Sequence, residues 1–296
     1  MKTLKKLAAI LLAAGMVVGC SSNSESTTTE NEESAKYAKI GLGFSIESSD
    51  ERTDSTIAVV GLDAEGKITY CDLDVAQLYK DSDDTRTKVE KAEDYGMKGT
   101  SGIGKEWYEQ AEFFANYVME NALTVDEVLE LTNDEGTDVA VGCTVHISGF
   151  QEAIEKAVAN AKDCECDSIS KGVNCVIEED QTDVTVVAVG STDGKIVAAS
   201  LDVAQIGFGS DDVRTKVEKA ADYGMSGVSS IGKEWYEQAA AFEDYIVGMT
   251  AADVAAIETY EKNESHPAVP AEGTDLASGC TINIGTFQEV VAEALA

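Results

Sequence analysis

Apolar, β-branched runs flank a two-residue turn signal at two places in the chain. Residues 55–75 turn at Glu65-Gly66, and residues 185–203 (TVVAVGSTDGKIVAASLDV) turn at Asp193-Gly194. A short polar dipeptide ending in glycine between two such runs is a strong hairpin signal, because glycine accepts the left-handed backbone that the turn needs. We therefore predict one antiparallel hairpin in each stretch.

Helical periodicity follows each hairpin. A short charged helix is predicted from about Thr87 to Asp94, with Gly96 as its stop. A stronger helix opens at Gly104-Lys105, where apolar side chains recur on one face at helical spacing, and its counterpart lies in the second stretch. The apolar positions are Trp107, Ala111, Phe114 and Val118 in the first helix and Trp235, Ala239, Phe242 and Ile246 in the second.

A third helix, a short strand and a final helix complete each stretch. The third helices begin at the capping-box pairs Thr124 with Glu127 and Thr250 with Asp253. The segments CTVHI (143–147) and CTINI (280–284) read as short strands. The final helices follow Phe150, Ile154, Ala157 and Val158, and Phe287, Val291 and Leu295. These elements predict an α+β fold, with a mainly antiparallel sheet and packed helices in each half.

The two stretches are copies of one another. Residues 82–111 align with residues 210–239 at a constant shift of 128, and only five of those 30 positions differ. The closing segments align at a shift of 137, so the second copy has a nine-residue insertion around YEKNESHPAVPAEG (260–273), which is expected to be an exposed loop. The predicted organisation is a signal peptide 1–20, a tether 21–38, a first repeat 39–162, a linker 163–172 and a second repeat 173–296.

The N-terminus has the pattern of an exported lipoprotein. Three lysines precede an apolar run that ends in VVGC at Cys20, and the run is shorter than the about 20 residues of a membrane-spanning helix. It resembles the lipobox of bacterial lipoproteins, which implies lipidation of Cys20 and an extracytosolic protein anchored to the bacterial membrane. An uncleaved anchor or a buried apolar helix is the alternative. The Ser/Thr/Glu-rich residues after Cys20 are expected to form a flexible tether.

The charge of the chain limits its partners. The formal net charge is −33, from 22 basic and 55 acidic residues. Such a surface repels polyanions, which excludes nucleic acid as a partner. Solubility at a wet cell surface and attraction to a basic partner both remain compatible with this charge.

The residues give little sign of a catalytic or metal centre. The Cys-x-Cys spacing in KDCECDSISKGVNC (162–175) is not that of a zinc site, which leaves a disulfide at Cys175 or free thiols. His146 and His266 are the only histidines, and no nucleophile–base set occurs in both copies. GIGKEWYEQA (102–111) suits either a phosphate-binding helix start or a structural turn. We assign no catalytic residue and no metal, and an electron carrier or binding protein is favoured over a hydrolase or transferase.

The closing segments carry the most specific motif. TDLASGCTINIGTFQE (274–289) contains Asp275, Ser278, Gly279, Cys280 and Thr281, and residues 137–152 repeat the pattern with Asp138, Gly142, Cys143 and Thr144. This pattern resembles the Asp-x-x-(Ser/Thr)-Gly-Ala-Thr motif of FMN-binding domains, found in extracytosolic lipoproteins and in flavin subunits of quinone reductase and Rnf complexes.

The resemblance implies covalent attachment of FMN by a flavin transferase, through the flavin phosphate, to Thr281 and Thr144. It assigns Asp275, Ser278, Gly279, Asp138 and Gly142 to the attachment site. Gly279 would let the backbone turn and present the hydroxyl, and Asp275 would bind the transferase's metal or fix the turn. The chain departs from the motif at Cys280 and Cys143, where the family has Ala, and at Val141.

Two readings of function follow. In the first, the protein carries covalent FMN outside the membrane and relays electrons to a redox partner. In the second, it is a non-catalytic surface lipoprotein that keeps the fold for binding or display.

Overall fold

A computed structural model describes residues 36–296 of the chain. The predicted signal peptide, the lipidation site Cys20 and most of the tether lie outside these residues. The described part forms one compact unit. None of its helices is long and apolar enough to cross a membrane.

Two antiparallel sheets form the centre of the fold. One has the strand order β3-β2-β1-β4 and the other has the order β5-β6-β7. The strands are β1 (Tyr37–Ser48), β2 (Arg52–Leu62), β3 (Ile68–Tyr79), β4 (Lys162–Cys166), β5 (Ser168–Ile177), β6 (Gln181–Thr192) and β7 (Lys195–Gly207). Both predicted hairpins, β2–β3 and β6–β7, are present, and Asp193 and Gly194 have the positive φ angles (52° and 73°) of the expected turn.

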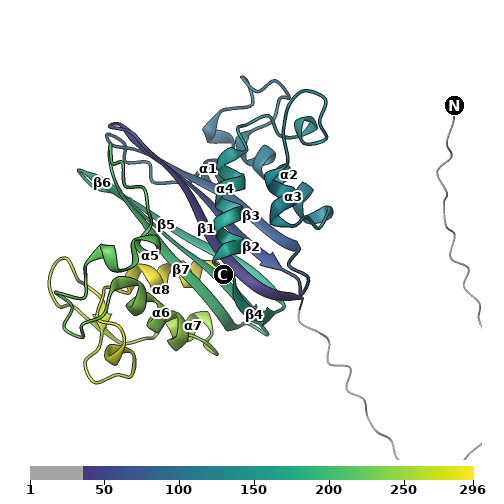
Figure 1. The fold of residues 1–296 in the computed structure, drawn as a ribbon. Helices are drawn as coiled ribbons and strands as arrows, with labels where there is room; N and C mark the ends of the chain where they lie inside the picture. Colours follow the sequence, from purple (N-terminus) through teal and green to yellow (C-terminus); the bar gives the residue numbers. More distant parts are fainter. Residues whose placement is uncertain (1–35) are drawn as a thin grey trace, which may run out of the picture. The chain divides into compact units, whose positions relative to one another are not determined.

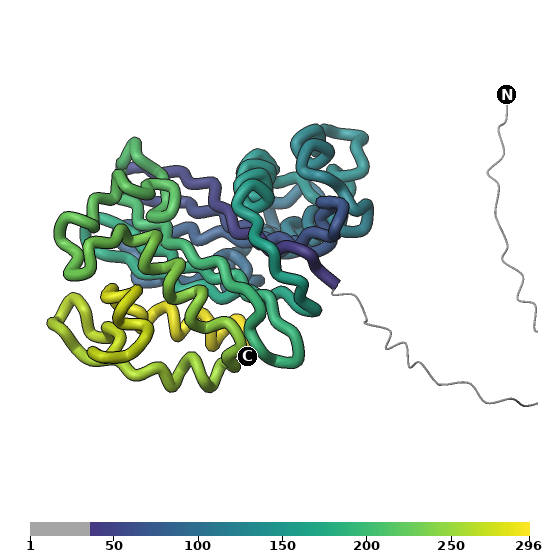
Figure 2. The backbone as a smooth tube through the Cα atoms, turned by 60° about the horizontal axis from the view of Figure 1, so that its bottom comes forward, coloured from purple at the N-terminus to yellow at the C-terminus, as the bar shows by residue number. Residues whose placement is uncertain are grey.

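The helices cover the outer faces of the two sheets, and Figures 1 and 2 show the strands between two groups of helices. The first group packs on β1–β3 and the second on β5–β7. The α-helices are α1 (Lys88–Lys91), α2 (Trp107–Glu120), α3 (Val125–Leu129), α4 (Ser148–Ala159), α5 (Lys216–Lys219), α6 (Trp235–Tyr245), α7 (Ala251–Ala255) and α8 (Gly285–Ala294). Short 3₁₀ turns are η1 (Ala92–Tyr95), η2 (Val139–Val141), η3 (Ala220–Tyr223) and η4 (Leu276–Ser278). The fold is α+β, as predicted.

The inner faces of the sheets share one apolar core. Alternate residues of β2 divide between two clusters: Ile57 and Val59 join the central core, whereas Ala58 and Val60 pack under α2 and α4. Successive strand residues point to opposite faces, so a strand covered on both sides reads as a continuous apolar run. Residues of both sheets meet in this central core, including Phe44, Leu78, Val184, Val186 and Ile206.

Equivalent positions of the two sheets also meet through polar groups. The hydroxyls of Thr53 and Thr182 lie 2.8 Å apart in the buried interior. Thr53 is paired with Leu78 and Thr182 with Ile206, so both threonines occupy the same place in their sheets. The inner faces of the two sheets therefore pack against each other around one core.

The helix predictions are confirmed in detail. The short charged helix forms as α1 and η1 and ends at Gly96 with a left-handed φ of 74°. All eight apolar positions predicted for the stronger helices are buried. Both capping boxes form, at Thr124 with Glu127 and at Thr250 with Asp253.

Three expectations about strands and connections were wrong. Residues 143–147 and 280–284 are not strands, because their backbones pair with no sheet and instead follow η2 and η4. Residues 163–172 are not a linker, since they contain most of β4, which pairs with β1, and the start of β5. The inserted segment is not only a loop, because Thr259–Tyr260 (β8) pairs with Val269–Pro270 (β9), and Val269 is buried.

Candidate functional site

The threonines of the closing motifs are held by buried glutamines. Gln238 Oε1 accepts hydrogen bonds from the Thr281 N–H at 2.8 Å and from the Thr281 hydroxyl at 3.1 Å. Gln110 makes the same pair of bonds with Thr144, at 2.8 and 3.0 Å. Both glutamine side chains are fully buried, whereas Thr144 is exposed and Thr281 is half-buried.

The same glutamines bind the glycine-rich loop. Gln238 Nε2 donates to the Lys233 carbonyl at 3.0 Å and to the Ser229 hydroxyl at 3.2 Å, and Gln110 repeats both contacts. Glu106 caps the start of α2 with its own carboxylate, which also accepts from the Met97 N–H. A carboxylate thus occupies the position where an anion would meet the helix dipole, and this favours the structural reading of GIGKEWYEQA (102–111).

The motif glycines are needed for close packing and not for a turn. Gly142 and Gly279 have φ angles of −128° and −114°, which any residue adopts. A Cβ atom on Gly279 would lie 2.9 Å from the Cβ of Ala241, and one on Gly142 would overlap the ring of Phe113. Gly279 does end the η4 turn, but with a negative φ angle, so the turn itself does not require glycine.

The remaining motif residues lie at the surface. Asp138 and Asp275 precede η2 and η4, are exposed, and make no capping hydrogen bond with their side chains. The Ser278 hydroxyl donates to the Asp275 carbonyl at 2.7 Å. No hydrogen bond joins the side chains of Asp275, Ser278 and Thr281 to one another.

The motif cysteines point away from this surface. Cys143 and Cys280 are buried in the cores beneath the helices, and burial raises the pKa of both thiols to about 11. All six cysteines of the described residues are free, and the Cys164 and Cys166 sulfurs lie 3.0 Å apart. Within residues 36–296, no His, Cys, Asp and Glu side chains gather in a group suited to a metal ion.

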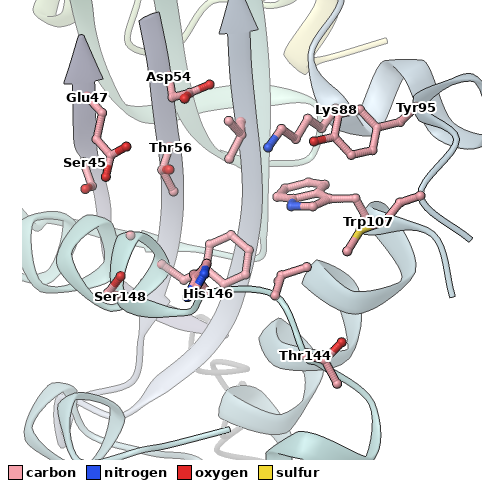
Figure 3. A pocket seen from close by; sticks show the side chains of 15 residues that line it. Ser45, Glu47, Asp54, Thr56, Lys88, Tyr95, Trp107, Thr144, His146 and Ser148 are labelled. Atoms are coloured by element: carbon pink, nitrogen blue, oxygen red, sulfur yellow. The ribbon is translucent and has the colours of Figure 1, made fainter. Parts of the chain in front are cut away.

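Two equivalent clefts lie where the strands meet the short helices, and sequence reasoning did not identify them. The first has a volume of about 400 Å³ and opens between β1–β3, α1 and α2 (Figure 3). The second, of about 390 Å³, lies at the matching place in the other half. Matching lining residues are Asp54, Thr56, Lys88, Tyr95 and Trp107 in the first cleft and Asp183, Thr185, Lys216, Tyr223 and Trp235 in the second.

One wall of each cleft is cationic and aromatic. The Lys88 Nζ lies 5.1 Å from the ring centroid of Tyr95 and 5.2 Å from that of Trp107. Lys216 has the same relation to Tyr223 and Trp235, at 5.5 and 5.4 Å. Burial lowers the pKa of both lysines, and the negative charges of Asp54 near Lys88 and of Asp183 near Lys216 partly oppose this shift.

The opposite wall is acidic and comes from the strands. Asp54 and Glu47 face Lys88 across the first cleft in Figure 3. Asp183 and Glu178 line the second cleft. In both aspartates, Oδ1 is buried and has no hydrogen-bond partner, and burial raises the pKa of Asp183.

Buried aspartates below the clefts fix the lysines in place. Asp74 Oδ1 accepts from the N–H groups of Val75 and Val89, which ties β3 to α1. Asp202 makes the same two bonds to Val203 and Val217. Each lysine is the first residue of its short helix, directly after a capping threonine. These bonds fix the backbone from which each lysine side chain enters its cleft.

The near-identity of residues 82–111 and 210–239 is a sequence signal for one wall of each cleft. Lys88, Tyr95 and Trp107 belong to the segment in which only five of 30 positions differ between the copies. Their partners on the strands lie outside that segment, so only the fold brings the two walls together.

Comparison with known proteins identifies no relative. No family model matches this chain, and neither a curated protein nor a solved structure matches it.

Proposed function

We propose that this chain is an extracytosolic, lipid-anchored binding protein whose two clefts take the same kind of small molecule. The observation that carries the proposal is the recurrence of one arrangement in both halves: a half-buried lysine on two aromatic faces opposite an aspartate with an unpartnered oxygen. Cavities of this size with a few convergent polar groups and perturbed pKa values are typical of ligand sites. The export signal and Cys20 support the extracytosolic, anchored location.

The cleft chemistry suits binding better than turnover. Its walls offer a cation, carboxylates, hydroxyls and aromatic faces, which recognise and orient a ligand. Lys88 and Lys216 lie over two rings each, which offsets part of the cost of burying the ammonium. We therefore favour a binding role for both clefts.

A thermal-shift screen tests this role. The full chain and the double variant Lys88→Met with Lys216→Met are heated with a broad small-molecule library. Ligands of the clefts raise the unfolding temperature of the wild type and not of the variant, because binding stabilises only the folded state. A library that stabilises neither protein, or both equally, would contradict the proposal.

FMN attachment at Thr281 is a second candidate. An open pocket of about 510 Å³ lies against Thr281 and is also lined by Ser230, Tyr260 and Ser278. Cys280 is buried in the core, so its thiol does not line the surface beside the Thr281 hydroxyl. These observations, with the resemblance of the motif, support a flavin carrier that would also need a flavin transferase and a redox partner.

Intact-mass measurement and in-gel flavin fluorescence test this candidate. The chain is co-expressed with a flavin transferase, as wild type and as Thr281→Val, Thr144→Val and the double variant. An adduct that disappears with Thr281→Val supports attachment there. Unmodified wild-type protein, or an adduct that persists in the double variant, refutes it.

A further inference from the structure

We infer that the two clefts recognise a zwitterion of the amino-acid type, with its carboxylate at the lysine wall and its ammonium at the acidic wall. The inference rests on the proposed binding function and names its ligand class. It comes from the opposed charges of the two walls, which recur in both halves.

Within the described part of the chain, the lysine wall has no carboxylate in direct contact with it. Among the described residues, no carboxylate lies within 4.0 Å of the Nζ of Lys88 or Lys216. The exposed arginines nearby, Arg86 and Arg214, do have such partners. A half-buried ammonium without a paired anion gains most from a ligand that brings a carboxylate into the cleft.

The acidic wall of the second cleft has no cation in direct contact among the described residues, whereas that of the first cleft has one. Asp54 Oδ2 accepts from the cationic Arg52 at 2.7 Å, whereas the matching Asp183 accepts from a neutral glutamine, Gln181, at 3.3 Å. Glu178 adds a second negative charge beside Asp183. An ammonium on the ligand would compensate these carboxylates, and the second cleft should bind it more tightly than the first.

A neutral ligand fits these walls less well. A sugar would satisfy hydrogen bonds but would leave the lysine, and Asp183 of the second cleft, without a counter-charge in direct contact. A simple anion or cation would satisfy one wall and oppose the other. Only a small molecule with both charges pairs with both walls, and its apolar part can lie against Trp107 or Trp235.

Isothermal titration calorimetry with the full chain tests the ligand class. The probes are the twenty free L-amino acids, and for each that binds, its N-acetyl and carboxamide derivatives. At least one free amino acid is expected to bind, and blocking either end should weaken binding about tenfold or more, as expected for loss of a charge-assisted hydrogen bond. Equal affinity of the free and blocked forms would overturn the inference.

Two variants assign the ends of the ligand. Lys216→Met should bind the free acid and its amide equally in the second cleft, and Asp183→Asn should bind the free amine and its N-acetyl form equally. Lys216→Arg, which keeps the charge, should retain the preference for the acid and controls for misfolding. Binding of neutral sugars in place of amino acids, lost in Lys216→Met, would overturn the zwitterion and leave the proposed function standing. Amino-acid binding in the second cleft that is unchanged in both Lys216→Met and Asp183→Asn would overturn both.

Discussion

The Thr281 hydroxyl and the Thr281 N–H both donate to Oε1 of the buried Gln238, at 3.1 and 2.8 Å. The amide of Gln238 donates in turn to the carbonyl of Lys233. One side chain thus joins the closing motif, α6 and the glycine-rich loop. The motif has a structural role in both halves, because Gln110 does the same for Thr144.

Gln238→Leu is expected to lower the free energy of unfolding by about 2–4 kcal/mol. The substitution keeps the side-chain volume similar but leaves buried polar groups without partners, at about 1–3 kcal/mol each. Urea unfolding followed by circular dichroism measures the change. Thr281→Val is the matched control, because it removes only one hydroxyl and should lose about 1 kcal/mol. Equal losses in the two variants would show that Gln238 does not link the elements.

Lys171→Met should destabilise the contact between the two halves. Lys171 lies on β5 with its side chain only 10 % exposed, and its Nζ is 2.5 Å from Asp72 and 3.6 Å from Asp74 on β3. Removing the cation leaves the buried Asp74 uncompensated, for which a loss of about 3–5 kcal/mol is typical. Chemical unfolding measures it.

An exposed ion pair serves as the control for Lys171 and its two aspartates. Lys39 and Asp163 lie 3.4 Å apart with side chains 48 % and 87 % exposed, so Lys39→Met should change stability by less than about 1 kcal/mol. If Lys171→Met changes stability as little as Lys39→Met, the ion pair does not hold the two halves together.

Asp202 should make the protein less stable as pH rises. Burial raises its pKa to about 7, above the about 3.9 of an unfolded aspartate. The contribution of Asp202 to the free energy of unfolding is therefore complete below about pH 4. It is lost as pH rises toward 7, because each unit of difference between the folded and unfolded pKa corresponds to about 1.4 kcal/mol. Asp202→Asn keeps an oxygen that accepts from Val203 and Val217 and should flatten the stability profile between pH 4 and 7.

Asp74→Asn is the matched variant in the other half. Asp74 has Lys171 as a partner 3.6 Å away, whereas Asp202 has no cation within 4.0 Å among the described residues. Asp74→Asn should destabilise the protein at neutral pH, and Asp202→Asn should stabilise it. Free energies of unfolding measured at several pH values test this difference. Identical pH profiles for Asp74→Asn and Asp202→Asn would contradict the claim that, of these two aspartates, only Asp202 is buried without a cation.

Local signals predicted the elements well, because hairpin turns, capping boxes and helical periodicity act over a few residues. The Asp193-Gly194 turn and the Thr124–Glu127 capping box formed as expected. The outer strand β5 was missed because its residues are mostly half-buried and do not form an apolar run. The segment 280–284 was mistaken for a strand, since its alternating Ile282 and Ile284 point into the core from an irregular backbone.

The arrangement of the site depended on contacts that no local pattern encodes. Lys88 and Trp107 lie in one segment, but Asp54 is more than 30 residues earlier in the chain, on another strand. The sequence also could not predict that the two sheets pack against each other. A run such as residues 57–62 is apolar whether helices or a second sheet cover it. The role of Gly142 became clear only from the ring of Phe113 packed against it.

Native mass spectrometry of the full chain, with the strongest stabiliser from the thermal-shift screen, tests the central claim that both clefts bind the same molecule. Two ligands should bind to each wild-type chain. One should bind to Lys88→Met and one to Lys216→Met at the concentration that saturates the wild type, and none to the double variant. Two ligands on the double variant, or a single ligand on the wild type, would contradict the account.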